Sequence, residues 1–190
     1  SDIFLTDISE VGRSKCLSFN KDFQGRYKLI KNNRSEFESE KFDLVLSIEV
    51  MEHVSDLNSY LRDIFRLLKP GGTFIWTTPC GNSLSIEHIY SLLTKQIIKT
   101  SEGYIKWKWE DPTHVRRLKS TEIEKELILA GFDKIKFRFR AHIFSFLCTY
   151  CPPRHLFHNI RNKIMKMDYK LFRLLPNGAS MVGAAQKPKL

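Results

Sequence analysis

The segment Phe42–Ile48 limits most strongly what this chain can fold into. It is an almost continuous apolar run, as expected for a central parallel strand that is covered on both faces. Asp56 then provides an N-cap for a helix with apolar residues at helical spacing, namely Leu57, Leu61, Ile64 and Leu68. Lys69-Pro70-Gly71-Gly72 ends that helix, and Thr73–Thr78 is a second strand. A strand–helix–strand unit of this kind predicts an α/β fold.

The same alternation continues along the chain. We expect strands over Ile3–Ile8, Tyr27–Lys31, Lys134–Arg140 and Ser180–Gln186. We expect helices over 9–20, 86–97 and 121–131, the last with a Thr121/Glu124 capping box, and over 143–175 with a break at Pro152-Pro153. The 190 residues therefore predict one domain, a Rossmann-like α/β fold with a largely parallel sheet, in which residues 142–178 are a helical insertion before the last strand. Ligands bind such sheets at the carboxyl ends of the strands.

Positive charge is concentrated in the last third of the chain. Residues 134–190 contain twelve Lys and Arg but one acid, Asp168, whereas the first 133 residues hold 19 basic and 20 acidic side chains. Such a field favours phosphate-bearing partners: anionic lipid, nucleic acid or a phosphorylated substrate. The alternative is a solvated basic face with no partner.

The four cysteines do not form a disulfide framework for a chain of this length. Cys148 and Cys151 make a single Cys-x-x-Cys, without the second ligand pair that a zinc site needs. Reduced structural thiols predict a cytoplasmic protein.

Three motifs in order carry a family resemblance. They are Phe42–Val54, then Leu67-Leu68-Lys69-Pro70-Gly71-Gly72, then His114–Ile123 followed by Ala130-Gly131-Phe132. Together they resemble class I S-adenosylmethionine-dependent methyltransferases, and more narrowly the group that includes the ubiquinone-pathway O-methyltransferases. The likeness covers roughly residues 3–140 and the final strand.

The resemblance implies which residues bind S-adenosylmethionine. Asp7, followed by Ile8, occupies the place of the acid that holds the ribose hydroxyls. Asn32 and Asn33 lie where the family approaches the adenine. In the same way Ser47, Ile48 and Glu49 lie beside the methionine moiety and the transferring methyl.

The start of the sequence departs from the family pattern. The family's first strand and its Gly-rich turn have no counterpart before Asp7. We therefore expect the sequence to be a fragment of a longer methyltransferase, truncated at the N-terminus. The alternative is a degenerate domain that has lost its cofactor site.

Candidate catalytic residues are His114, Glu52 and His53. His114 lies in the loop that faces the acceptor in the family, and its ordinary pKa suits a general base; alternatively it orders that loop. The pattern Glu49-x-x-Glu52-His53 is associated with Mg²⁺ in the ubiquinone-type relatives, whereas other relatives carry Glu-His without metal. We assign no metal ligand, and Mg²⁺ stays an open alternative.

Two other segments have alternative interpretations. Tyr90, Tyr104, Trp107 and Trp109 form either a lid over an acceptor or the core of a cap. The segment 143–175 carries one apolar stripe with basic flanks, composed of Leu156, Ile160, Ile164, Met167, Leu171 and Leu175. It either docks on the sheet or lies on an anionic membrane surface, which would place the protein peripherally at a membrane.

The resemblance implies methyl transfer from S-adenosylmethionine to a small-molecule or lipid-linked acceptor, at oxygen, by in-line alignment with little acid–base chemistry. The alternative is a non-catalytic scaffold or binding partner. A nucleic-acid partner is disfavoured, because the base-modifying Asn/Asp-Pro-Pro-Tyr motif is absent after Ile48. A dehydrogenase of the same fold class would not explain the Glu-His and Lys-Pro-Gly-Gly motifs together.

Overall fold

A computed structural model describes residues 2–31, 34–100, 103, 105–150 and 158–189. None of the helices in these ranges is long and apolar enough to cross a bilayer. Short 3₁₀ turns, η1 (Lys21–Phe23) and η2 (Met51–His53), accompany the main elements. The strands are β1 (Leu5–Asp7), β2 (Tyr27–Lys31), β3 (Arg34–Ser35), β4 (Phe42–Ile48), β5 (Leu68–Pro79), β6 (Ile97–Lys99), β7 (Ile105–Trp107), β8 (Asp133–Arg140) and β9 (Ser180–Gln186). The helices are α1 (Glu10–Phe19), α2 (Leu57–Leu67), α3 (Ile86–Leu93), α4 (Ser120–Ala130), α5 (Ile143–Tyr150) and α6 (His158–Phe172).

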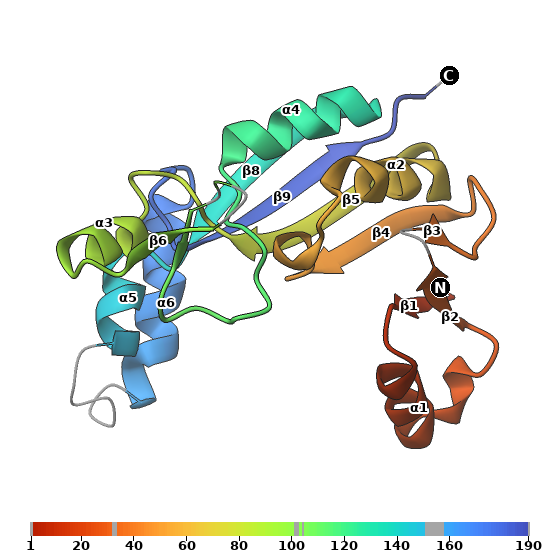
Figure 1. Cartoon of the computed structure of the whole chain (residues 1–190), viewed down its shortest axis with the longest axis horizontal. Coiled ribbons are helices and arrows are strands. Elements are labelled where there is room, and N and C mark those ends of the chain that lie inside the picture. The colour runs from red at the N-terminus through yellow and green to blue at the C-terminus, as the bar shows by residue number, and fades with distance from the viewer. Residues whose placement is uncertain (1, 32–33, 101–102, 104, 151–157, 190) are drawn as a thin grey trace.

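A four-stranded sheet in the order β4-β5-β9-β8 forms the centre of the molecule (Figure 1). β4 and β5 pair in parallel, and β9 runs antiparallel to both β5 and β8. Three of the four strands therefore run in one direction, and their carboxyl ends lie at one edge. The Rossmann-like α/β fold expected from the sequence is confirmed.

Helices α2 and α4 lie together on one face of this sheet (Figure 1). Asp56 caps α2 as expected, accepting a hydrogen bond from the Ser59 amide at 3.0 Å. The apolar side chains of both helices contact the inward-facing residues of β5 and β9. Burying large apolar side chains in this way is the main stabilising contribution to such a core.

Trp76 packs directly against the backbone of Gly183 in that core. The Trp76 side chain is fully buried and stacks on Phe74 with ring centroids 5.0 Å apart. Gly183 is its direct partner across the β5–β9 ladder. A Cβ at Gly183 would lie 2.0 Å from Trp76 Cζ2, so the indole occupies the space that any other residue would fill.

The opposite face of the sheet is open along β4. Leu44, Leu46 and Ile48 point to this face and are 47%, 60% and 57% exposed. β4 pairs only with β5 among the described residues. The expectation of a central strand covered on both faces is therefore wrong for these residues, because α2 covers one face of β4 and nothing described covers the other.

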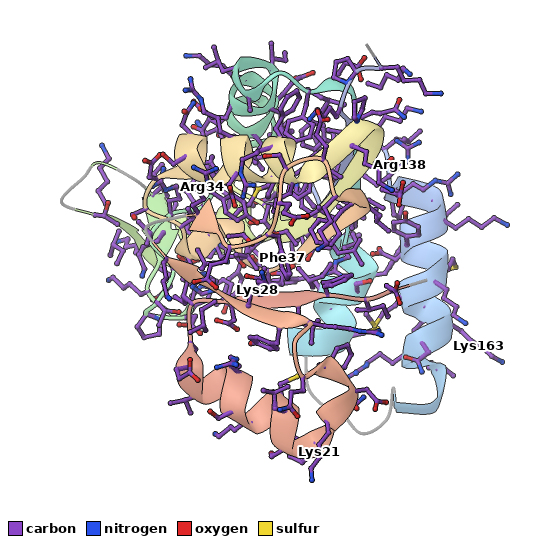
Figure 2. All side chains as sticks on the ribbon, turned by 90° about the vertical axis from the view of Figure 1, so that its right-hand side faces the viewer. Lys21, Lys28, Arg34, Phe37, Arg138 and Lys163 are labelled. Carbon is purple, nitrogen blue, oxygen red and sulfur yellow. The ribbon has the colours of Figure 1, made fainter. Side chains whose placement is uncertain are left out.

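β1, β2 and β3 form a separate sheet in that order. Its attachment is a cluster of three rings, Phe4, Phe37 and Phe42, with centroids 5.3–5.5 Å apart; Figure 2 shows Phe37 close to Lys28 of β2. Arg66 strengthens the junction by donating to the carbonyl oxygens of Phe37 and Ser35. The sequence-predicted positions of β1 and β2 are confirmed, although β1 is shorter than Ile3–Ile8.

Other boundaries differ from the sequence-based expectation. α3 ends at Leu93, and Ile97 begins β6. Leu68 is buried as expected but starts β5 and does not end α2. α4 begins one residue before Thr121, and the reciprocal contact is made by Glu122, whose carboxylate accepts from the Lys119 amide at 2.9 Å. Helix ends are the positions at which local sequence signals are least exact.

Substituting Gly183→Ala tests the Trp76 contact. The added methyl group forces the buried indole to move, so we expect a loss of about 1–3 kcal/mol in the free energy of unfolding. The control is Gly12→Ala in α1, where a Cβ meets ordinary contacts at 3.4 Å and the substitution favours a helix. Urea denaturation of both variants measures the difference; equal effects would contradict the packing described.

Candidate functional site

β4 ends in a strained turn at the carboxyl edge of the sheet. Glu49 has a φ of 51°, which is rare for a residue with a side chain of this size. Its amide donates to the Thr77 carbonyl oxygen at 3.0 Å, and its carboxylate lies 3.4 Å from an Arg140 guanidinium nitrogen. Such backbone strain persists only where the surroundings fix it, and it concentrates at functional sites. The edge where β4, β5 and β8 end is therefore the candidate site.

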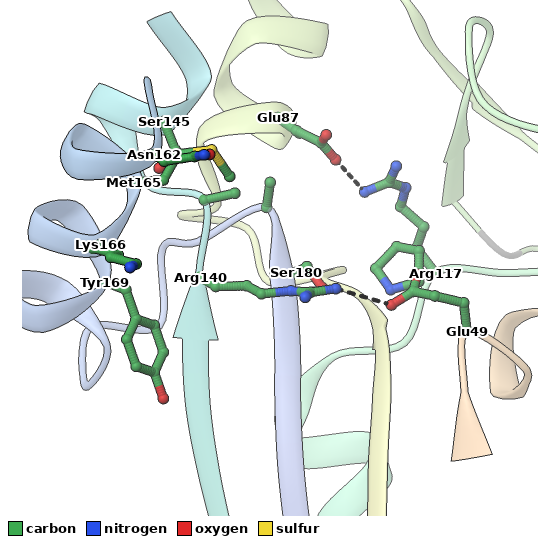
Figure 3. A pocket seen from close by; sticks show the side chains of 13 residues that line it. Glu49, Glu87, Arg117, Arg140, Ser145, Asn162, Met165, Lys166, Tyr169 and Ser180 are labelled. Carbon is green, nitrogen blue, oxygen red and sulfur yellow. Dashed lines mark hydrogen bonds and ion pairs between the residues drawn. The ribbon is translucent and has the colours of Figure 1, made fainter. Parts of the chain in front are cut away.

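A cavity of about 680 Å³ opens at this edge (Figure 3). Its floor comes from the strand ends, and its wall comes from α5 and α6. Figure 3 shows Arg140 reaching across the floor toward Glu49, with Lys166 and Tyr169 on the α6 side. The lining residues are Glu49, Pro79, Glu87, Arg117, Arg140, Ala141, Ser145, Asn162, Met165, Lys166, Tyr169, Ala179 and Ser180.

Arg117 is a buried charge of the site. Its side chain is 4% exposed and pairs with Glu87 at 2.6 Å and with Glu110. The guanidinium also lies 4.8 Å from the centroid of the Trp107 ring. Burial raises the pKa of Glu87, and the neighbouring Arg117 opposes that shift. Trp107 is consequently part of this buried packing, whereas Trp109, also near Arg117, is 39% exposed.

Glu52, His53 and His114 come together beside the cavity. One potential ligand atom from each lies within 4.8 Å of the others. Glu52 is buried, and its Oε2 accepts from the Thr78 hydroxyl at 3.0 Å. The two imidazole rings are 4.8 Å apart in an edge-to-face arrangement. The structure thus brings together the three residues that the sequence analysis selected for catalysis.

Burial shifts the pKa of two members of this cluster. The pKa of Glu52 is raised, first by burial and then by the nearby Glu49 carboxylate. The pKa of His114 is lowered, chiefly by burial, which favours the neutral imidazole. Among the described residues, Glu52 Oε1 and His114 Nδ1 are buried without a hydrogen-bond partner. Two buried polar atoms of this kind form a place where a polar group of a ligand can make hydrogen bonds.

The Glu52–His53–His114 cluster does not suit Mg²⁺. This ion prefers oxygen ligands in octahedral geometry, whereas the cluster offers one carboxylate and two imidazoles. Glu49, the further carboxylate of the sequence pattern, is paired with Arg140 and lies outside the cluster. We therefore derive no step through Mg²⁺ and treat the three residues as an acid–base group.

The described residues that are expected to bind the cofactor lie at two different sheets of the structure. Asp7 and Ile8 are exposed at the end of β1, on the three-stranded sheet. Asn32 and Asn33 lie outside the described residues. Ile48 and Glu49 lie at the candidate edge, but the Ser47 side chain points the other way and hydrogen-bonds to Tyr60, so only its backbone is available to a ligand. These cofactor contacts stay predictions.

Sequence reasoning missed Arg140 and the Arg117 ion pairs. Arg140 ends an alternating basic strand, and nothing in that pattern distinguishes it from its exposed neighbours Arg138 and Lys136. Arg117 lies inside the quoted His114–Ile123 motif, but its charge is buried through pairing with Glu110 of the preceding loop and with Glu87, which is 30 residues away in the sequence.

Residues 1–136 match the family described as methyltransferase domain. The chain belongs to this family. The match includes all three motifs in order and ends within β8. The recognition of a class I methyltransferase from the sequence is thereby confirmed, and S-adenosylmethionine is the cofactor that the family supports.

Curated relatives match over parts of their length. The chain is 27% identical over 150 residues to the mitochondrial 2-methoxy-6-polyprenyl-1,4-benzoquinol methylase of Pongo abelii, covering 72% of this chain and 45% of that protein. It is 59% identical over 39 residues to the ubiquinone biosynthesis O-methyltransferase of Ruegeria pomeroyi, covering 20% of this chain and 16% of that protein. The chain spans less than half the length of either relative.

Solved methyltransferase structures share the fold. A SAM-dependent methyltransferase from Thermotoga maritima superposes with a TM-score of 0.57 at 16% identity, covering 97% of this chain and 73% of that one. An S-adenosylmethionine-dependent methyltransferase from Mesorhizobium loti gives 0.54 at 17% identity, covering 96% and 79%. At these identities the likeness concerns the fold alone.

Substituting Arg117→Met tests the buried ion pairs. The change leaves Glu87 and Glu110 buried without their counter-charge, so we expect a loss of about 3–5 kcal/mol in the free energy of unfolding. The control Arg13→Met breaks an exposed pair with Glu10 and is expected to cost about 0.5 kcal/mol or less. Thermal and urea unfolding give both values. Comparable effects would show that the enclosed pairs contribute no more than an exposed one.

Substituting Glu52→Gln tests the raised pKa. A carboxyl group whose pKa is raised on folding contributes stability below its unfolded pKa, and that contribution is lost as the pH rises through the folded pKa. Glutamine does not titrate. We therefore expect the variant to gain stability relative to the parent protein between pH 5 and pH 8, measured by urea unfolding. Exposed Glu124→Gln is the control; a constant difference for Glu52→Gln across this range would contradict the shift.

Proposed function

We propose that the protein transfers the methyl group of S-adenosylmethionine to a hydroxyl oxygen of a small-molecule or lipid-linked acceptor held in the cavity beside Glu49. The family match over residues 1–136 carries the reaction class. The names of the matched relatives, a ubiquinone biosynthesis O-methyltransferase and a polyprenyl-benzoquinol methylase, support an acceptor of this kind. The choice of oxygen follows the first of these names.

Asp7 and Glu49 are the residues that suit the cofactor. Asp7 presents an exposed carboxylate at the end of β1, and its Oδ1 accepts from the Ser9 amide at 3.0 Å. The exposed carboxylate can also bind a ribose diol, which such a group recognises well. Glu49 would face the methionine end. When bound, S-adenosylmethionine supplies a methyl group already activated on a positively charged sulfur.

The cavity suits an acceptor with an apolar body and a polar or anionic end. Met165 and Tyr169 offer apolar contact from α6, whereas Arg140 and Lys166 offer positive charge. Holding the acceptor in line is the main catalytic requirement, because a well-oriented reaction gains several orders of magnitude in rate.

His114 is the proposed proton acceptor for the hydroxyl. Its lowered pKa favours the neutral imidazole, and its Nδ1 has no hydrogen-bond partner among the described residues. Glu52 and His53 hold the cluster in place: the Glu52 carbonyl oxygen accepts from the Val115 amide at 2.8 Å, and His53 Nδ1 lies 3.1 Å from the Thr113 hydroxyl. His114 lies beside the cavity but does not line it. Its assignment as the base therefore rests on the geometry of the Glu52–His53–His114 cluster and on the lowered pKa of His114.

Two substitutions separate cofactor binding from turnover. We expect Asp7→Asn to weaken S-adenosylmethionine binding about tenfold or more, because a charged acceptor of hydrogen bonds becomes neutral. We expect His114→Gln to leave that affinity unchanged and to lower kcat about 10²–10⁴-fold with a quinol acceptor. Calorimetric titration measures the affinity, and tritiated methyl transfer measures the turnover.

The control for Asp7 is Glu10→Gln, an exposed acid three residues along. If neither the parent protein nor its variants bind S-adenosylmethionine, the proposed function fails as a whole. If binding is normal and His114→Gln keeps full turnover, only the assignment of the base fails.

A non-catalytic binding role is the second candidate. The free edge of β4 and the exposed Leu44, Leu46 and Ile48 favour it, because a strand edge left unpaired among the described residues accepts another polypeptide strand. Absence of S-adenosylmethionine binding in the titration above, together with retained fold, would place this candidate first.

A further inference from the structure

Helix α6 carries an apolar stripe that faces away from the rest of the protein. Ile160, Met167 and Leu171 lie on one side of the helix at spacings of seven and four residues, and they are 46%, 46% and 62% exposed. Leu174, just beyond the helix, is 65% exposed. Ile164 of the same stripe is half-buried, and Leu156 lies outside the described residues. The alternative in which the stripe docks on the sheet is therefore not what the structure shows for Ile160, Met167 and Leu171.

A different face of α6 holds the helix against the protein. Asp168, on that face, is fully buried and accepts hydrogen bonds from the amides of His142 and Phe144 and from the Ser145 hydroxyl. Phe172, one turn further, lies 5.9 Å from the Phe144 ring. Because packing uses this face, the apolar stripe has no internal role in the described structure.

Positive charge flanks the stripe. Lys163 and Lys170 lie on one side of it and Arg161 on the other, and all three are exposed. No carboxylate of the described residues forms an ion pair with them. The acid of the same helix, Asp168, is turned inward, so this face has no negative charge to offset its cations. Figure 2 shows Lys163 pointing outward from α6.

We propose that this face of α6, defined by Ile160, Met167 and Leu171 with Arg161, Lys163 and Lys170, docks the protein on an anionic membrane surface. An exposed apolar stripe between cations is the pattern of a helix that lies in the plane of the lipid interface. The lysines meet anionic head groups while the apolar side chains enter the boundary with the acyl chains.

The charge pattern distinguishes a lipid surface from two other occupants. A second copy of this chain would bring the same cations opposite these ones, and their repulsion opposes a symmetric dimer. A nucleic acid would pair with the cations but leave the apolar stripe in water. An anionic bilayer uses both features at once.

The position of α6 connects this surface to the cavity. Lys166 and Tyr169 line the cavity from the same helix whose other side carries the stripe. A protein seated on the bilayer through α6 would therefore hold the cavity close to the lipid surface. This inference goes beyond the proposed methyl transfer and does not depend on it.

Vesicle sedimentation of the full chain tests the proposal. The vesicles contain phosphatidylcholine alone or phosphatidylcholine mixed with phosphatidylglycerol. We expect binding to the mixed vesicles only, weakened as salt approaches about 1 M, where charges are screened beyond about 3 Å. The apolar pair Ile160→Ser/Leu171→Ser and the basic pair Lys163→Gln/Lys170→Gln are each expected to lower the partition coefficient at least about tenfold, since each lysine near the surface contributes about fivefold.

Matched controls carry the same changes on α1 and η1, elsewhere in the molecule. They are Val11→Ser/Phe19→Ser, which are apolar residues even more exposed than the tested pair, and Lys15→Gln/Lys21→Gln. Circular dichroism of every variant verifies the fold. No binding of the parent protein to mixed vesicles would overturn the proposal. So would losses no larger than those of the controls, or loss with the basic pair alone, which would indicate a general affinity for polyanions.

Discussion

Arg117 determines the arrangement of the chain above the carboxyl edge of the sheet. Its guanidinium joins Glu87 of α3 to Glu110 of the loop after β7, and it lies under the rings of Trp107 and Trp109. A buried guanidinium needs such partners, because removing it from water is costly. The segments that surround the candidate site are therefore held together by charge pairing, whereas the sheet and its two covering helices are held by apolar contact.

Glu49 and Arg140 place a pair of charged side chains at the carboxyl edge of the sheet. The positive φ of Glu49 turns its carboxylate back over the strand ends, where Arg140 of β8 meets it. Between β4 and β8 run β5 and β9, and Pro79 at the end of β5 and Ser180 at the start of β9 also line the cavity. The antiparallel β9 thus brings the helical segment α5–α6 to the same edge at which β4 and β5 end. The basic segment that looked separate in the sequence becomes one wall of the cavity.

The sequence was sufficient for the four strands of the central sheet, for its covering helices and for part of the candidate site. Alternation of apolar and polar residues located β2 and β8, a nearly continuous apolar run located β4, and the capping signal of Asp56 located α2. The spacing of Glu52 and His53 at a strand end, with His114 in the acceptor-facing loop of the family, selected residues that the fold brings within 4.8 Å. These features are local or carried by family motifs.

What the sequence did not reveal depends on long-range contacts. Exposure of β4 follows from which strands pair, and a run of apolar residues looks the same whether one face or both are covered. The orientation of the α6 stripe had the same ambiguity. The periodicity defined the stripe, but only the hydrogen bonds of Asp168 show that a different face is the buried one.

The buried Asp168 side chain also holds α5 and α6 together. Its carboxylate on α6 accepts the amides at the start of α5, so the two helices are registered by hydrogen bonds that bypass residues 151–157. The wall of the cavity that these helices form consequently depends on a carboxylate that does not itself line the cavity.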